Sequence, residues 1–108
     1  MGKAVLLIKA GDLQGLSAAL ESNAQLASAR DSTGLTLLHW ACDQGQLEIV
    51  ERLTKAHKVD LNAQDEEGST PLHLACLSER NHIVTYLKEH GVDTSIKDNS
   101  GSTAEEYL

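Results

Sequence analysis

Apolar residues recur along the chain at helical spacing, in short stretches separated by polar segments. Leu72, Ala75 and Cys76 lie at positions i, i+3 and i+4, which places them on one face of a helix. A second apolar stripe follows within residues 83–87, after a turn, and two stripes of the same kind precede it within residues 38–53. The pattern predicts pairs of short helices that bury their apolar faces only by stacking on neighbouring pairs.

The segments between the helix pairs carry turn and capping signals. An Asp-x-x-Gly stretch is typical of a tight turn, because Gly68 within it can adopt a positive φ. Thr70 is a residue type that caps helices, and Pro71 then takes the first helical position, where no N–H donor is needed. Gly91 stands where the second helix of that pair is expected to end.

The C-terminal segment has a capping signal of its own. Thr103 is followed three residues later by Glu106, which is the spacing of a capping box. We therefore expect residues 103–108 to form one further short helix that docks on the preceding pair.

The whole pattern repeats along the chain. The stretch DSTGLTLLHWAC begins at Asp31, DEEGSTPLHLAC at Asp65 and DNSGSTAEEYL at Asp98, so the intervals are 65 − 31 = 34 and 98 − 65 = 33 residues. The downstream halves LEIVERL and NHIVTYL also match, and the N-terminal stretch fits more loosely. We predict one domain over 1–108, divided into a degenerate repeat at 1–30, repeats at 31–64 and 65–97, and a truncated capping repeat at 98–108.

These motifs resemble the ankyrin repeat, whose period and Thr-Pro-Leu-His-x-Ala signature they share. The resemblance implies an all-α fold, a solenoid of helix-turn-helix units joined by β-hairpin-like turns. Three positions depart from the family pattern. Leu37 replaces the proline, Glu79 replaces the glycine found at Gly45, and 57–58 make one loop a residue longer. The glutamate at position 79 affects the turn after the helix that contains Leu72, where the family pattern has glycine.

A narrower resemblance concerns the parent protein. LLHWACDQG, LNAQDEEGSTPLHLAC and GVDTSIKDNSGSTAEE are similar to the ankyrin segment of acyl-CoA-binding-domain proteins. That resemblance implies a multidomain, lipid-binding parent. Acyl-CoA would then bind only through a helical domain that this chain does not contain.

Composition and charge narrow the possible functions. Hydrophobic residues make up 41% of the chain but aromatic residues only 3%, and phenylalanine is absent, so Leu, Ile, Val and Ala must supply the core. A net charge of −7 argues against a nucleic-acid partner and against an anionic membrane surface. The longest apolar run, Ala4 to Ile8, is too short to span a bilayer. With only two cysteines, the expected location is the cytoplasm, with the nucleus as the alternative.

Two His/Cys pairs are the candidates for chemistry. His39 and Cys42 recur at the same spacing as His73 and Cys76, so a zinc site or a thiol-dependent site is the alternative function. Equivalent residues on stacked helices lie about 8–10 Å apart, too far for one Zn²⁺ with ligands at about 2.0–2.3 Å. We therefore expect neither an enzyme nor a bound cofactor. The ankyrin resemblance implies structural roles instead for Thr36, His39, Thr70, Pro71 and His73, with the imidazoles bonding across each hairpin and helix start.

The ankyrin resemblance also implies where a protein partner binds, namely the hairpin tips and the concave face of the first helices. The matching positions are Ser32, Thr33, Leu35, Glu66, Glu67 and Ser69 at the tips, and Trp40, Asp43, Gln44, Leu74, Leu77 and Ser78 on the helices. Apolar Leu35, Trp40 and Leu77 would form the centre, inside an acidic surround. The expected partner therefore offers an apolar anchor and a basic rim. A second role also fits Trp40, that of a largely buried wedge between repeats.

Overall fold

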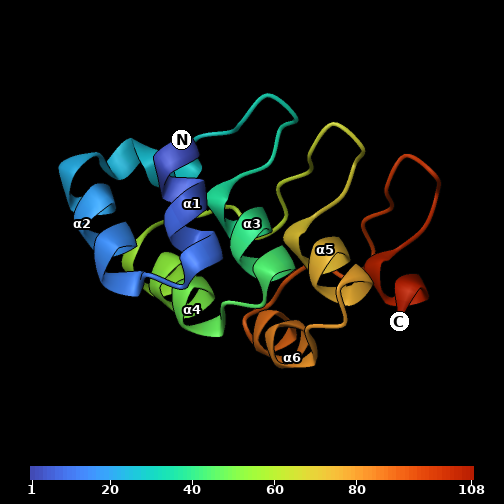
Figure 1. Cartoon of the computed structure of the whole chain (residues 1–108). Helices are drawn as coiled ribbons and strands as arrows, with labels where there is room; N and C mark the ends of the chain where they lie inside the picture. The colour runs from blue at the N-terminus through green and yellow to red at the C-terminus, as the bar shows by residue number, and fades with distance from the viewer.

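The computed structural model describes every residue from Met1 to Leu108 (Figure 1). In chain order its helices are α1 (Gly2–Ala10), α2 (Leu13–Ser22), the 3₁₀ helix η1 (Ala24–Ser28), α3 (Leu37–Gln44), α4 (Leu47–Ala56), α5 (Pro71–Leu77), α6 (Asn81–Glu89) and the 3₁₀ helix η2 (Ala104–Tyr107). None of these helices combines the length and the apolar composition that crossing a bilayer requires. The fold is an ankyrin solenoid built entirely from helices and turns.

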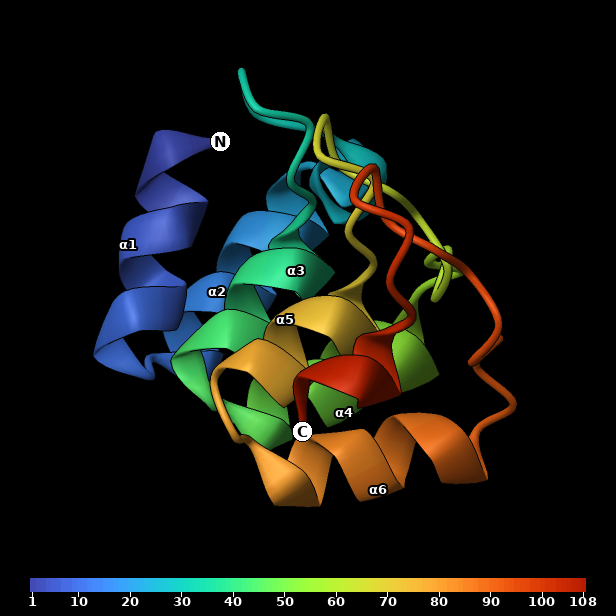
Figure 2. The ribbon, with the colours of Figure 1, turned by 90° about the vertical axis from the view of Figure 1, so that its right-hand side faces the viewer.

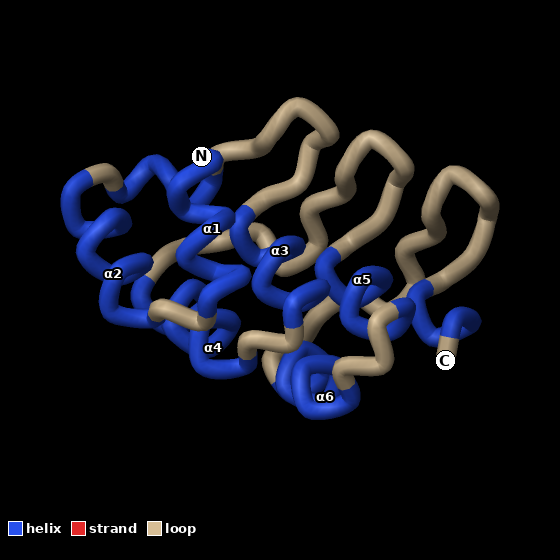
Figure 3. Tube along the Cα trace, in the orientation of Figure 1, coloured by secondary structure: helices blue, strands red, loops and turns tan.

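The helices form two layers. Helices α1, α3, α5 and η2 follow one another in a row, and each contacts the next. Helices α2, α4 and α6 form the second layer, each packed on its own partner from the first row; Figure 2 shows α6 below α5. Three long loops stand side by side above the first row (Figure 3). The molecule measures 38 × 27 × 22 Å, with its long axis along the stack.

The three loops are hairpins without regular strands, since the only β-bridge is a single antiparallel pair between Lys97 and Thr103. Neighbouring tips are hydrogen-bonded to one another. The amide of Glu66 donates to the Thr33 carbonyl at 3.1 Å, and the amide of Asn99 donates to the Glu67 carbonyl at 2.9 Å. The hairpins therefore form a continuous edge along the stack.

Glycine is required in these hairpins for two reasons. Gly68 has a φ of 78°, in the left-handed region. A Cβ at this position would lie 2.9 Å from the backbone nitrogen of Asn99, in the next hairpin. Close approach of successive tips and the sharp turn both exclude a larger residue.

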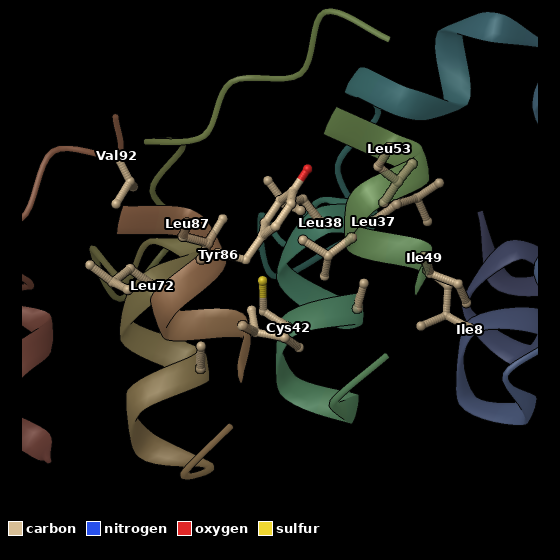
Figure 4. Packing of buried hydrophobic residues seen from close by; sticks show 14 of the residues in the cluster. Ile8, Leu37, Leu38, Cys42, Ile49, Leu53, Leu72, Tyr86, Leu87 and Val92 are labelled. Atoms are coloured by element: carbon tan, nitrogen blue, oxygen red, sulfur yellow. The ribbon is translucent and has the colours of Figure 1, made fainter. Parts of the chain in front are cut away.

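One hydrophobic cluster runs through the whole stack, from Ala4 in α1 to Ala104 in η2. The predicted stripes supply it, and the close-up view shows residues of α3, α4, α5 and α6 meeting between the layers (Figure 4). Leu38, Leu53, Leu72 and Leu87 are at most 1% exposed. No single helix pair could cover these side chains, so the stability of each pair depends on its neighbours.

The C-terminal segment forms the expected short helix, but without the predicted capping box. Residues Ala104–Tyr107 form a 3₁₀ turn rather than an α-helix, and the Thr103 side chain makes no capping bond, so the predicted capping box is wrong. A segment of one turn closes more readily with i→i+3 bonds, such as that from the Glu106 amide to the Thr103 carbonyl at 3.2 Å. Tyr107 anchors the segment through its hydroxyl, which donates to Asp98. That bond is the largest cause of a pKa of Asp98 well below the usual range.

The turn after α5 keeps the family geometry without the family glycine. Glu79 adopts a φ of 56°, close to the 72° of Gly45 at the equivalent turn after α3. A non-glycine residue in the left-handed region raises the free energy of the folded state by about 1–2 kcal/mol. Glycine avoids this strain, but it loses more backbone entropy on folding.

We therefore expect Glu79→Gly to raise the free energy of unfolding by about 0.5–1 kcal/mol in urea denaturation. The opposite change, Gly45→Ala, should destabilise the protein, because a Cβ there also meets the Arg80 side chain at 2.9 Å. A Glu79→Gly protein less stable than wild type would show that the glutamate side chain has a stabilising role of its own.

Candidate partner-binding site

The His39 side chain ties one repeat to the next. Its Nδ1 accepts a hydrogen bond from the Thr36 amide at 3.1 Å, while its own amide donates to Thr36 Oγ1 at 3.3 Å. On the other side of the ring, Nε2 donates to the Ser69 carbonyl at 2.9 Å. His39 is fully buried, so a single imidazole caps α3 and fastens it to the following hairpin.

His73 makes the same bonds one unit later. Its Nδ1 accepts from the Thr70 amide at 3.1 Å, and its Nε2 donates to the Ser102 carbonyl at 3.0 Å. Pro71 occupies the first turn of α5, where the missing N–H has no cost. The second bond of His73 is only partly buried, because the C-terminal unit covers it less completely.

These contacts leave the His/Cys pairs little chemical capacity. Both ring nitrogens of His39 are already hydrogen-bonded, so a metal would have to displace the cap of α3 or the bridge to Ser69. No group of three or more His, Cys, Asp or Glu side chains is placed to hold a metal ion. Cys42 and Cys76 are both buried and unpaired. Burial raises the pKa of both thiols, whereas a nucleophilic cysteine needs a lowered one.

We expect the two thiols of the native protein to react slowly with a disulfide reagent. Both sulfurs are out of contact with solvent, so reaction requires local or global opening. The rate in native buffer should be slower by on the order of a hundredfold or more than the rate in urea, measured by absorbance of the released thiolate. Fast labelling of either cysteine in the folded protein would restore the thiol alternative.

Protonation of His39 should weaken the fold. Burial is the main cause that lowers the pKa of His39, so the unfolded chain takes up this proton at a higher pH than the native chain. The stabilisation is complete above about pH 6.5 and is lost as the pH falls from there toward the lower native pKa, by at most about 1.4 kcal/mol per pH unit. Protonated Nδ1 would also face the Thr36 N–H, donor against donor.

Urea denaturation between pH 7.5 and about pH 5, above the range where most carboxylates titrate, measures this loss. A His82→Gln variant, changed at an exposed position of α6, should retain the same pH dependence as wild type. A flat profile in wild type would contradict the prediction.

The hairpin tips divide into exposed and buried positions. Ser32, Thr33, Glu66 and Glu67 are exposed, and the carboxylates of both glutamates are free of protein partners. Ser69 is the least exposed of the predicted tip residues. It is only 8% exposed because its amide donates to Asp65 and its carbonyl receives the His39 bond. Leu35, at the position equivalent to Ser69, is partly buried.

Trp40 is partly exposed and held on two sides. Its Nε1 donates to Asp31 Oδ2 at 3.0 Å, and the Lys9 ammonium lies 5.0 Å from the ring centroid. The ring packs against the core at one side. Trp40 therefore links α1, α3 and the first hairpin, and it still presents part of its surface to solvent.

Asp43 is less available than its charge implies. Its Oδ1 accepts from the Ser78 hydroxyl at 2.9 Å, and its Oδ2 accepts from the Gln44 side chain at 3.1 Å. These three residues, each partly exposed, form a polar strip that joins α3 to α5. The acidic character of the face therefore comes mainly from the hairpin tips.

Leu77 is the most exposed apolar side chain of the predicted site, at 52%, whereas Leu74 beside it is partly buried. Leu77 stands at the edge of an open hollow of ≈ 490 Å³ between the second and third hairpins. The hollow is lined by Glu67, Ser69, Leu77, Asp98, Asn99, Ser100 and Tyr107. It brings an apolar helix residue and an unpaired carboxylate to one place.

The sequence analysis did not assign two residues to this face, Leu6 of α1 and Tyr107 of η2. Leu6 is 66% exposed, and Tyr107 is partly exposed at the wall of the hollow. The signal that identifies them is the repeat register, because 40 − 6 = 34 and 107 − 74 = 33 place them in line with Trp40 and Leu74. Neither lies in a complete repeat motif, so motif matching did not reach them.

Comparison with known proteins gives a consistent picture. The family model described as "Ankyrin repeats (3 copies)" matches residues 4–104. The chain is 31% identical over 101 residues to protein phosphatase 1 regulatory subunit 27 of Homo sapiens, which covers 94% of the chain and 65% of that protein. It is 36% identical over 86 residues to 26S proteasome non-ATPase regulatory subunit 10 of Dictyostelium discoideum, covering 80% of the chain and 37% of that protein.

A third similarity is shorter. The chain is 43% identical over 58 residues to palmitoyltransferase akr1 of Schizosaccharomyces pombe, which covers 54% of the chain and 9% of that protein. The chain thus spans less than two thirds of the length of each of these curated relatives. The similarity concerns the repeat region and carries no activity with it.

Proposed function

The chain belongs to the ankyrin-repeat family, and from this premise we propose that it is a non-catalytic module that binds a partner protein through its hairpin tips and the inner face of its first helices. Ankyrin repeats generally mediate protein–protein interaction, and two of the relatives described above are regulatory subunits. We refer to the surface formed by the tips and by α1, α3, α5 and η2 as the inner face.

One observation carries this proposal. Leu77 exposes half of its surface on the inner face, and the same hollow is lined by Glu67, whose exposed carboxylate is unpaired. An exposed apolar side chain with a charged rim is the usual composition of a protein-binding surface. No large apolar side chain of α2, α4 or α6 is exposed, and the surface hollow on α4 is lined mainly by the charged residues Glu48, Glu51, Arg52 and Lys55.

Affinity capture followed by quantitative mass spectrometry tests the proposal. Wild-type protein and the Leu77→Asp variant are used as bait in parallel, with Glu51→Lys on α4 as the control. We expect proteins that wild type and Glu51→Lys retain equally and that Leu77→Asp loses. Partners lost with Glu51→Lys and kept with Leu77→Asp would place binding on the outer helices instead.

Two further points belong to the same proposal. We place the module in the cytoplasm or the nucleus, because its two buried thiols are unpaired, which fits a reducing compartment. The similarity to ankyrin segments of acyl-CoA-binding-domain proteins remains a prediction about the parent. Any acyl-CoA binding would depend on that other domain, since the hollow beside Leu77 is lined by Tyr107 but by no Lys or Arg.

A further inference from the structure

A single row of apolar and aromatic side chains runs along the inner face. Leu6, Trp40, Leu74 and Tyr107 occupy the same position in four successive units, at intervals of 34, 34 and 33 residues. They come from α1, α3, α5 and η2, which lie side by side in that order. All four are exposed in full or in part, and we call them the inner row.

The hairpin aspartates next to the inner row are not equally satisfied. Trp40 Nε1 donates to Asp31 Oδ2, and the Tyr107 hydroxyl donates to Asp98 Oδ2. In the middle unit the equivalent side chain is Leu74, which has no donor. Asp65 uses Oδ1 for the amides of its own turn, and its Oδ2 accepts no bond within the chain. Since Asp65 is partly exposed, this acceptor is open to a donor from outside.

We propose that the inner row binds an extended segment of a partner protein, whose apolar side chains recur at every third residue and which carries an arginine beside them. This inference rests on the proposed function and names the class of partner. The arginine lies in the hollow between Leu77 and Tyr107 with its guanidinium at Glu67. A backbone N–H of the segment donates to Asp65 Oδ2, as Trp40 Nε1 does to Asp31.

The spacing of the row matches an extended chain. Packed helices lie about 8–10 Å apart, so the inner row presents one side chain per step of that length. A polyproline II chain has three residues per turn and rises about 3.1 Å per residue, so every third side chain returns to the same face after about 9 Å. A side chain at every third residue therefore meets a new member of the row each time.

The width of the row argues against a helix as the occupant. A helix that docks in a groove uses an apolar stripe several residues wide. The row next to the inner row contains Lys9 and Asp43, with Leu77 as its only apolar member. The N–H groups along a helix are also bonded internally, whereas an extended chain can offer one to Asp65.

Charge fits the same occupant. The chain carries 16 acidic against 9 basic Lys and Arg residues, and Glu66 and Glu67 stand exposed at the hairpin tip. Arginine can lay its aliphatic stem on Leu77, stack on Tyr107 and reach a carboxylate in one conformation. An acidic segment would instead be repelled by the carboxylates of this hairpin tip.

Isomeric peptides test the inference directly. Fluorescein-labelled peptides of about 12 residues carry leucine at every third position, at every second position, or at helical i, i+3, i+4 and i+7 positions, each with one arginine and otherwise equal composition. Anisotropy measures binding, and fluorescence of Trp40, the sole tryptophan, reports contact with the row. We expect the every-third peptide to bind saturably and at least about tenfold more tightly than its isomers.

Three variants localise the binding. Leu77→Asp and Leu74→Ser should each weaken the every-third peptide by about tenfold or more. Asp65→Asn keeps the turn acceptor but replaces Oδ2 by an amide, so it should weaken binding while Glu48→Lys on α4 does not. Circular dichroism checks folding, and the exposed position of Leu77 keeps the test valid if Leu74→Ser fails to fold.

Specific outcomes would overturn the inference. Equal binding of all isomers, tighter binding of the helical peptide, or no binding at millimolar concentration would exclude the extended segment. Concentration-dependent dimers that Leu77→Asp abolishes would show that a second copy occupies the face. Each of these results leaves the proposed module intact if a captured protein still depends on Leu77, so the two proposals fail separately.

Discussion

Replacing His39 by alanine is expected to lower the free energy of unfolding by on the order of 3–5 kcal/mol, a large part of the roughly 5–15 kcal/mol typical of a small domain. The change leaves the Thr36 amide without a partner and removes one of the two hydrogen bonds that the Ser69 carbonyl accepts, the other coming from the Asp65 amide, and both Thr36 and Ser69 are less than 9% exposed. Each unsatisfied buried group costs about 1–3 kcal/mol, and the lost ring adds a cavity. Urea denaturation followed by circular dichroism measures the effect.

Alanine variants of two other histidines provide the comparison for the loss of stability in His39→Ala. His73→Ala should cost less than His39→Ala, because its bond to the Ser102 carbonyl is partly buried and water can replace it. His82→Ala, at an exposed position on α6, should change stability by no more than about 0.5 kcal/mol. A loss below about 1 kcal/mol for His39→Ala would mean that neighbouring groups or water satisfy the bonds of the imidazole.

Leu77→Asp should weaken the complex with a partner by about 2 kcal/mol or more, which is about thirtyfold in Kd, mainly through faster dissociation. The change places a charge at the apolar centre of the inner face, where desolvation on binding is greatest. Leu77 is half exposed in the free protein, so its replacement should leave the fold intact. Surface plasmon resonance with a captured partner separates the two rate constants.

The acidic tip should act on the other rate constant. Glu66→Lys with Glu67→Lys is expected to slow association and to reduce its dependence on salt, since exposed rim charges steer encounter and are screened. The double change Glu48→Lys, Glu51→Lys on α4 alters the net charge equally and serves as the matched control. If that control slows association as strongly, total charge rather than the tip governs the encounter.

Local signals predicted most of the fold. Helical apolar stripes, the cap formed by Thr70 with Pro71 and the hairpin glycines act over a few residues, and they recur at intervals of 34 and 33 residues. The structure contains the corresponding helices and turns. The capping box predicted at Thr103 is wrong, because a capping box belongs to the first turn of an α-helix and this segment forms only a single 3₁₀ turn. Glu79 shows the opposite case, since contacts of α5 and α6 hold a glutamate in a conformation that its own preference disfavours.

The candidate site was less accessible to sequence reasoning. Repeat alignment placed Ser69 among the tip residues. In the structure Ser69 is buried, and its carbonyl is hydrogen-bonded to His39, thirty positions away. Asp43 was predicted as a binding residue of the helix face, but the hydroxyl of Ser78, at the end of α5, occupies one of its oxygens. Both differences arise from contacts between units, which pairwise spacing along one chain segment does not describe.

The sequence alone therefore determined the repeat, its helices and its turns, because propensity, capping and glycine geometry act over a few neighbouring residues. Only the tertiary structure decided which polar groups of one unit are satisfied by the next. It decided in the same way that Asp31 and Asp98 each accept a bond from a member of the inner row, while Asp65 Oδ2 is left open. Stacking brings residues more than thirty positions apart within hydrogen-bond reach, and their geometry depends on the packed core between them.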